Sequence, residues 1–233
     1  MIIGIIGATG NIGQRVVREA LERGHQVVGF TRDLATVGVA EASIVWKAVD
    51  VLDANSLRAT IDCLDVLISL YQPGNAAKDF NDTVARSIAD PSVYVTAARA
   101  LLSALEDYPR TRLIVVGGAG SLEVRPGVVP ADTPAELRQT LERLGLPADY
   151  EVAVRGHRDA LNVYRLSNRL WTYLSPAAEI YAGERTGRFR LGGDQLVVDA
   201  EGRSRISFED AAIAVIDEAE LPRHVQRRFT IGY

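Results

Sequence analysis

The sequence has little sulfur and little lysine: its single cysteine is Cys63, and its two lysines are Lys47 and Lys78. One cysteine excludes an internal disulfide and a cysteine-rich zinc site, and nothing in the sequence indicates an oxidising compartment. There is no basic excess either, since 26 Lys and Arg against 30 Asp and Glu leave a net charge of −4. No apolar run approaches the length of a membrane span, and no signal-like segment precedes the first apolar run. We therefore expect a soluble, cytoplasmic protein that binds no nucleic acid, membrane or metal, with Cys63 as a small core residue.

The strongest local pattern opens the chain. Residues 2–6 form a short, almost unbroken apolar run, as in a strand that is covered on both faces. Gly7, Gly10 and Gly13 follow at three-residue spacing, and the apolar residues of 12–21 then share one helical face. Such a turn lets a pyrophosphate lie against the helix N-terminus, where unpaired N–H groups and the helix dipole favour an anion. This unit predicts a bound dinucleotide; the alternative is a glycine-rich turn that binds nothing.

The end of the second expected strand, at residues 26–30, bears on which dinucleotide binds. In this fold that end meets the adenosine ribose, roughly twenty residues past the glycines. An acidic side chain there binds the 2′-hydroxyl, whereas an arginine accepts a 2′-phosphate. Here the strand runs into Thr31 and Arg32, with Asp33 one position later. We predict a 2′-phosphate site and therefore NADP; the alternative is a solvated Arg32, with Asp33 holding the ribose of NAD.

The rest of the chain alternates between expected strands and helices. Further strands are expected at 44–49, 65–70, 112–116, 170–174 and 227–231, and helices at 55–63, 81–89, 93–107, 136–144, 150–167 and 207–219. This order predicts an α/β fold in which residues 1–233 form a single domain with a doubly wound parallel sheet. Residues 121–133 are expected to be an irregular active-site cover. Four glycines between 183 and 193 predict a small hairpin at about 188–199, outside the main sheet and within a substrate-side insertion or lid at 178–206.

With these pieces placed, the chain resembles the atypical short-chain dehydrogenase/reductases. It is most similar to the small NAD(P)H-binding reductases of the flavin reductase/biliverdin-IXβ reductase type and to NmrA-like proteins. The resemblance rests on G-A-T-G-N-I-G at 7–13, Thr31-Arg32-Asp33, Asp50-Val51, G-G-A-G-S at 117–121, W-T-Y-L-S-P-A at 171–177 and R-I-S at 205–207.

The resemblance implies a Rossmann fold and a set of cofactor-binding residues. The phosphates would be held by Gly7, Thr9, Gly10, Asn11, Ile12 and Arg32 beside Thr31, the adenine by Asp50 and Val51, and the nicotinamide half by Leu70, Tyr71, Gly118, Ser175 and Pro176. From the residues alone, Asp50 could accept a hydrogen bond from the adenine amino group while Asp53 or Asn55 caps the following helix.

One departure from the wider superfamily bears on the reaction. Most of its members use a Tyr-x-x-x-Lys pair, in which the lysine lowers the tyrosine pKa for proton transfer. In this chain Tyr150 is followed four residues later by Val154, and Tyr164 by Asn168. Hydride transfer without that pair suits an acceptor that spreads the negative charge itself, such as a flavin or a quinone.

Two kinds of protein remain compatible with the sequence, with a third less so. We expect an NADPH-dependent reductase of an aromatic or conjugated small molecule, acting as a monomer or homodimer. The alternative is a non-catalytic, NmrA-like sensor that binds NADP. An epimerase or lyase fits less well because it needs the missing pair.

Three residues are candidates for assisting the reaction. Tyr71 could stack on a ring, or only pack at the sheet edge. Ser121 could bind a substrate oxygen, although a serine in a glycine turn often makes a local hydrogen bond. His157 could present a neutral imidazole to the substrate, or be a core histidine bonded to a backbone carbonyl.

Overall fold

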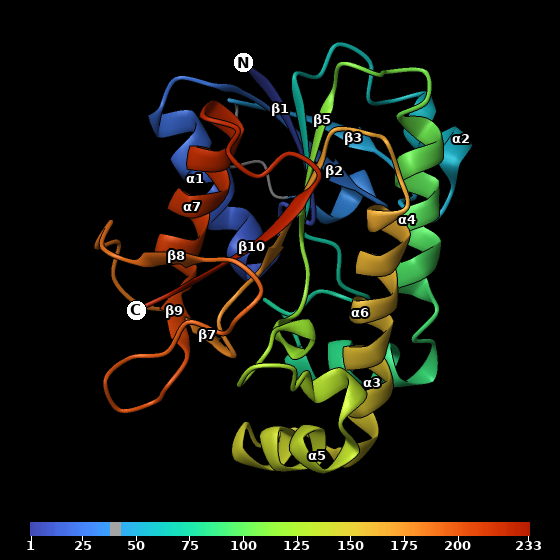
Figure 1. Cartoon of the computed structure of the whole chain (residues 1–233). Coiled ribbons are helices and arrows are strands. Elements are labelled where there is room, and N and C mark those ends of the chain that lie inside the picture. Colours follow the sequence, from blue (N-terminus) through green and yellow to red (C-terminus); the bar gives the residue numbers. More distant parts are fainter. Residues whose placement is uncertain (38–42) are drawn as a thin grey trace.

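The computed structural model describes residues 1–37 and 43–233, and in this part of the chain eight strands form one central sheet (Figure 1). The order is β3-β2-β1-β4-β5-β6-β10-β8, with β8 antiparallel to β10 and the other neighbours parallel. The bounds are β1 Ile2–Ile6, β2 Gln26–Thr31, β3 Ile44–Ala48, β4 Val66–Ser69, β5 Arg112–Val116, β6 Trp171–Ser175, β8 Arg190–Gly192 and β10 Arg227–Gly232. The doubly wound α/β fold predicted from the sequence is confirmed.

Helices cover both faces of this sheet (Figure 1). One face carries α1 and α7, which contact each other, and the other carries α2, α4 and α6. The helix bounds are α1 Asn11–Glu22, α2 Ala54–Arg58, α3 Phe80–Ala89, α4 Val93–Ala104, α5 Pro134–Arg143, α6 Glu151–Arg165 and α7 Phe208–Glu220, with 3₁₀ turns η1 Leu34–Thr36, η2 Ala119–Ser121, η3 Pro130–Asp132 and η4 Ala148–Tyr150. The sheet therefore has a hydrophobic core on each face, which explains why its central strands lack alternation.

The expected hairpin at 188–199 is not formed. Instead β8 joins the edge of the main sheet through β10, with Ile231 opposite Leu191. Two other short strands, β7 Glu179–Tyr181 and β9 Arg205–Ser207, form a separate parallel pair. The glycines do indicate where the chain turns. They could not show that β8 pairs with β10, which lies some forty residues farther along the chain.

Buried Asp210 on α7 anchors the segment between β7 and β8. Its carboxylate accepts hydrogen bonds from the backbone N–H groups of Thr186 and Gly187, both at 2.8 Å, and from the hydroxyl of Tyr233 at 2.8 Å. Arg185 extends the attachment through two hydrogen bonds to Glu19 on α1, at 2.8 and 2.9 Å. Ser207 caps α7, one residue before the helix begins, because its hydroxyl accepts from the N–H of Asp210.

The expected helix at 55–63 is much shorter, and the expectation for Cys63 is wrong. The helix α2 ends at Arg58, where the hydroxyl of Thr60 turns back to donate to the carbonyl of Ser56. Such local bonds compete with helix continuation. Cys63 is exposed, with a positive φ of 63°. At the other end, Asp53 caps the helix by accepting from the N–H of Asn55, as one sequence interpretation proposed.

Candidate functional site

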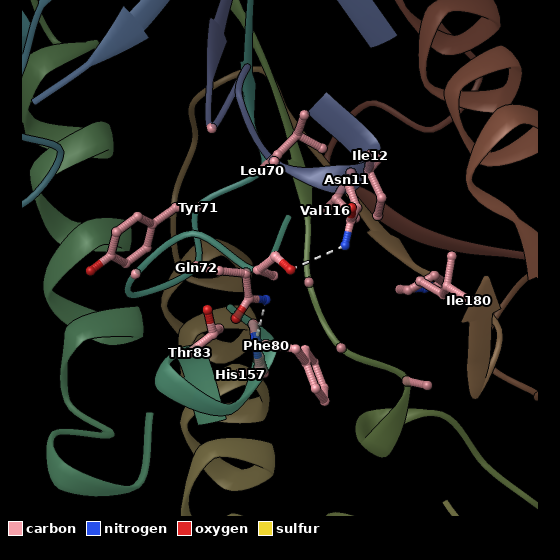
Figure 2. A pocket seen from close by; sticks show the side chains of 18 of the residues that line it. Asn11, Ile12, Leu70, Tyr71, Gln72, Phe80, Thr83, Val116, His157 and Ile180 are labelled. Carbon is pink, nitrogen blue, oxygen red and sulfur yellow. Dashed lines mark hydrogen bonds between the residues drawn. The ribbon is translucent and has the colours of Figure 1, made fainter. Parts of the chain in front are cut away.

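A cavity of about 840 Å³ opens at the carboxyl ends of the parallel strands (Figure 2). It lies where the strand order reverses, with β1 leading away to β2 on one side and to β4 on the other. Ligands of open α/β sheets bind in the crevice at such a switch point. The volume is within the range of about 300–1,000 Å³ that is usual for small-molecule sites.

The glycine turn forms one wall of the cavity. Gly7 has a φ of +79°, and a Cβ there would lie 2.7 Å from the carbonyl oxygen of Leu70. A Cβ on Gly13 would collide with the carbonyl of Gly7, so this glycine lets α1 start directly against the turn. Gly10 is the N-cap of α1 and no side chain caps the helix. The first helical N–H groups therefore face the cavity without a capping side chain, which is the arrangement that a pyrophosphate requires.

The loop after β4 lies across this turn. The side-chain amide of Asn75 donates to the hydroxyl of Thr9 at 3.1 Å, and that of Asn11 donates to the carbonyl of Ala76 at 3.4 Å. All four residues line the cavity. Sequence reasoning pointed to Thr9 and Asn11 but not to the 74–79 loop, which is more than sixty residues away in the chain.

The predicted adenosine end is brought together only in part. Thr31, Arg32 and Asp33 line the cavity, and so does Val51. Asp50 does not: it is exposed, and its carboxylate accepts from the N–H of Leu52 at 3.0 Å. The structure thus places the carboxylate of Asp50 in a local turn rather than on the cavity wall.

The opposite end is built from loops after β4, β5 and β6. Three residues expected near the nicotinamide, Leu70, Gly118 and Pro176, line the cavity. Ser175 does not; it is completely buried, and its hydroxyl has no hydrogen-bond partner in the described part of the chain. Gly118 packs against the imidazole of His157, where a Cβ would lie 3.3 Å from the ring, so a larger residue would push the ring away.

His157 projects from α6 into this end (Figure 2). Its Nε2 lies 3.3 Å from the side-chain nitrogen of Gln72, and its ring packs on Tyr94 with the ring centres 3.9 Å apart. The hydroxyl of Tyr94 donates to the Gln72 side-chain oxygen, which leaves the Gln72 amide nitrogen to donate to His157. Burial lowers the pKa of His157 to about 4. The imidazole is therefore neutral at pH 7, with its proton on Nδ1.

The two other assisting candidates are placed differently from His157. Ser121 does not line the cavity; its hydroxyl accepts from Arg228 at 3.1 Å, a partner 107 positions away rather than the local one that a serine in a glycine turn often has. Tyr71 lines the cavity, but its ring turns toward α4, away from His157 and Phe80 (Figure 2). It packs against the core on that side, 6.5 Å from Tyr94.

Beyond the predicted residues, the cavity has an apolar lobe that the sequence did not reveal. It is bounded by α5, the start of α6 and the first residue of α3, and its lining includes Phe80, Val124, Pro130, Leu137, Leu141, Leu144, Leu146, Tyr150 and Val154. Phe80 is 53% exposed although it is a large apolar side chain. The apolar face of α5 could have indicated the lobe. However, sequence periodicity alone cannot distinguish a helix face that lines a cavity from one that packs on the core.

These features define a Rossmann protein with a nucleotide-type site at the switch point of its sheet. The pattern of the NAD(P)H-binding family matches residues 7–219, and the chain belongs to that family. The resemblance drawn from the sequence is confirmed at this level. Within the part of the chain that the structure describes, no helix is long and apolar enough to cross a membrane.

Three proteins illustrate the similarity over full length. The Bacillus subtilis protein named "uncharacterized protein YwnB" is 35% identical, over 99% of this chain and 98% of its own length. A structure from Burkholderia pseudomallei, named a "putative exported protein", is 38% identical with a TM-score of 0.80, and each chain is covered completely. One from Streptococcus pneumoniae, named a "putative NADH-flavin reductase", is 25% identical with a TM-score of 0.79, over 100% of this chain and 99% of that one.

Proposed function

We propose that the protein is an NADPH-dependent reductase that passes a hydride to a conjugated acceptor such as a flavin or a quinone. One observation carries the proposal: the cavity that contains the glycine turn continues into an apolar lobe, and among the described residues that line the cavity no tyrosine or histidine is tuned as a proton donor at neutral pH. The Streptococcus pneumoniae structure named a "putative NADH-flavin reductase" supports the same class of acceptor.

The titratable groups of the cavity explain why the acceptor must manage its own charge. Burial raises the pKa of both Tyr71 and Tyr150, so neither tyrosine is a prepared acid. His157 is neutral and remains so across the physiological range. An alkoxide developing in this cavity would lack a strong donor, whereas a conjugated ring delocalises the charge and takes its proton from water.

The residues divide into roles along the cavity. Bound NADPH supplies the hydride. We assign Gly7, Gly10 and the start of α1 to the diphosphate, Arg32 to the 2′-phosphate, and Leu70 and Gly118 to the nicotinamide half. His157, held by Gln72 and Tyr94, orients the reacting rings through Nδ1–H, and the apolar lobe excludes water.

The 178–206 segment forms part of the cavity wall in this proposal. Ala178, Ile180 and Leu196 line the cavity. The hydrogen bonds to Asp210 and Glu19 hold the neighbouring residues of the segment. We therefore propose a fixed wall on the substrate side rather than a lid that opens and closes.

Cofactor choice is tested by Arg32→Ala. Arg32 lines the cavity and is exposed, and in the described part of the chain it forms no ion pair, so its charge is available to a phosphate. We expect the variant to bind NADP at least about tenfold more weakly, since hydrogen bonds to charged groups are worth ~1.5–3 kcal/mol, and to bind NAD almost unchanged. Titration calorimetry with both cofactors measures this, and an equal loss for both would contradict the 2′-phosphate assignment.

The activity is tested by following reduced-nicotinamide absorbance with NADPH and a panel of flavins and quinones. We expect oxidation of NADPH that depends on both the protein and the acceptor. Tight NADPH binding without turnover of any acceptor in the panel would instead favour the sensor.

A further inference from the structure

The charges around the cavity differ in sign from the charge of the whole protein. The chain has a net charge of −4. The described residues that line the cavity nevertheless include four cations, Arg32, Lys78, Arg86 and Arg143, and one carboxylate, Asp33. A cavity lined by one sign of charge concentrates ligands of the opposite sign. NADPH, with its diphosphate and 2′-phosphate, accounts for part of this excess.

Three of the four cations lie at or beside the part of the cavity where the cofactor phosphates are assigned. Arg32 follows β2 at the adenosine end, and Lys78 belongs to the loop whose Asn75 bonds to Thr9. Arg86 on α3 lies beside that loop, because a Cβ on Gly74 would be 3.4 Å from its Cδ, whereas Arg143 belongs to α5, which borders the apolar lobe. Of these four cations, Arg143 is left without a cofactor group to bind.

Arg143 lines the cavity and is also exposed, and its neighbour Leu144 lines the apolar lobe. Arg86 is already paired, since its Nε lies 2.7 Å from Asp82. Arg143 forms no ion pair with any carboxylate that the structure describes. It directly precedes Leu144, and Leu137 and Leu141 on the same helix line the interior of the lobe. One helix thus presents an apolar wall that ends in an unpaired cation.

From this arrangement we infer that the acceptor carries an anionic group, a phosphate or a carboxylate, on its conjugated ring system, and that Arg143 binds that group. The ring lies against the leucines of α5 and the acidic tail reaches Arg143. This inference rests on the proposed function for the identity of the ring. It adds the tail and the residue that recognises it.

FMN and riboflavin test the inference because they share one ring system and differ by a phosphate. Flavin fluorescence is titrated with protein that is saturated with NADP⁺, so that the cofactor phosphates already occupy their own cations. We expect FMN to bind about three- to tenfold more tightly than riboflavin, as for one partly exposed charge-assisted contact. The preference should shrink toward one in Arg143→Gln, with riboflavin affinity unchanged.

The matched control is Arg138→Gln. Arg138 is exposed on the same helix but does not line the cavity, so the substitution removes the same charge outside the site. It should keep the FMN preference. Equal affinity for the two flavins, binding of neither, or the same loss in both variants would overturn the inference. Selective FMN binding without NADPH oxidation would overturn the reductase proposal and leave the anion subsite standing, whereas turnover without selectivity would do the reverse.

Discussion

Gly7→Ala is expected to abolish binding of the nicotinamide cofactor, with a Kd raised by at least about 100-fold. The φ of +79° at Gly7 is strained for any residue with a Cβ, at a cost of roughly 1–3 kcal/mol. The added carbon would also lie 2.7 Å from the carbonyl oxygen of Leu70, which belongs to the backbone and cannot rotate away. Relief requires the turn to move, and the start of α1 moves with it. The N–H groups assigned to the diphosphate would then lose their alignment.

Gly24→Ala separates the effect of backbone strain from the effect of the collision with the backbone of Leu70. Gly24 has nearly the same φ, +78°, but a Cβ there meets nothing within 4 Å. It lies after α1, at the end opposite the cavity. We expect this variant to lose thermal stability from backbone strain alone, and therefore less than Gly7→Ala loses, and to bind NADPH like the wild type. Titration calorimetry and thermal unfolding on both variants measure the two quantities; normal NADPH binding by Gly7→Ala would contradict the assignment of the turn.

The parts of the fold that the sequence predicts are those specified by neighbouring residues. The turn at Gly7 depends on a backbone conformation that only glycine adopts easily, and the start of α7 depends on a hydroxyl three residues before its partner N–H. Both signals are local, so both were readable without the structure. The Arg32 position is of the same kind, because it follows directly from the end of β2.

The parts that could not be predicted depend on contacts between distant segments. The residue pair Gln72 and His157 is 85 positions apart in the chain, and no pattern near either residue indicates the other. The pairing of β8 with β10 was missed for the same reason. Arg143 is one of many arginines in the sequence, and only the position of α5 shows that it lies at a cavity. Local sequence thus indicates the glycine-turn end of the cavity better than the end bordered by α5.

His157 should make the protein lose stability between pH 7 and pH 5. Its pKa is about 4 in the folded protein, because burial disfavours the charged imidazole, whereas an unfolded histidine titrates near ~6.5. Below pH 6.5 the unfolded chain therefore takes up a proton that the folded protein does not. Above about pH 6.5 this histidine takes nothing from the free energy of unfolding. Below about pH 6.5 that free energy falls progressively toward pH 4, and the loss is about 2 kcal/mol at pH 5.

Protonation would also disturb the contacts of the ring. The Gln72 amide nitrogen donates to Nε2 in the neutral form, and a protonated Nε2 would set one donor against another. The effect can be isolated because carboxylates with lowered pKa, such as Glu19 and Glu220, respond only near and below their ordinary range. Urea unfolding from pH 7 to pH 5 thus reports mainly on histidine.

The informative comparison is between the wild type, His157→Gln and His157→Phe. Neither replacement titrates. The fall in the free energy of unfolding between pH 7 and pH 5 should therefore be about 2 kcal/mol smaller in both variants than in the wild type, whatever the substitution does to stability at pH 7. If either variant follows a curve parallel to that of the wild type, His157 is not the group responsible. A confirmed pKa near 4 has a consequence for the proposed reaction, because it means that the histidine in this cavity does not serve as an acid at neutral pH. The acceptor must then carry the negative charge itself, as the proposed function requires.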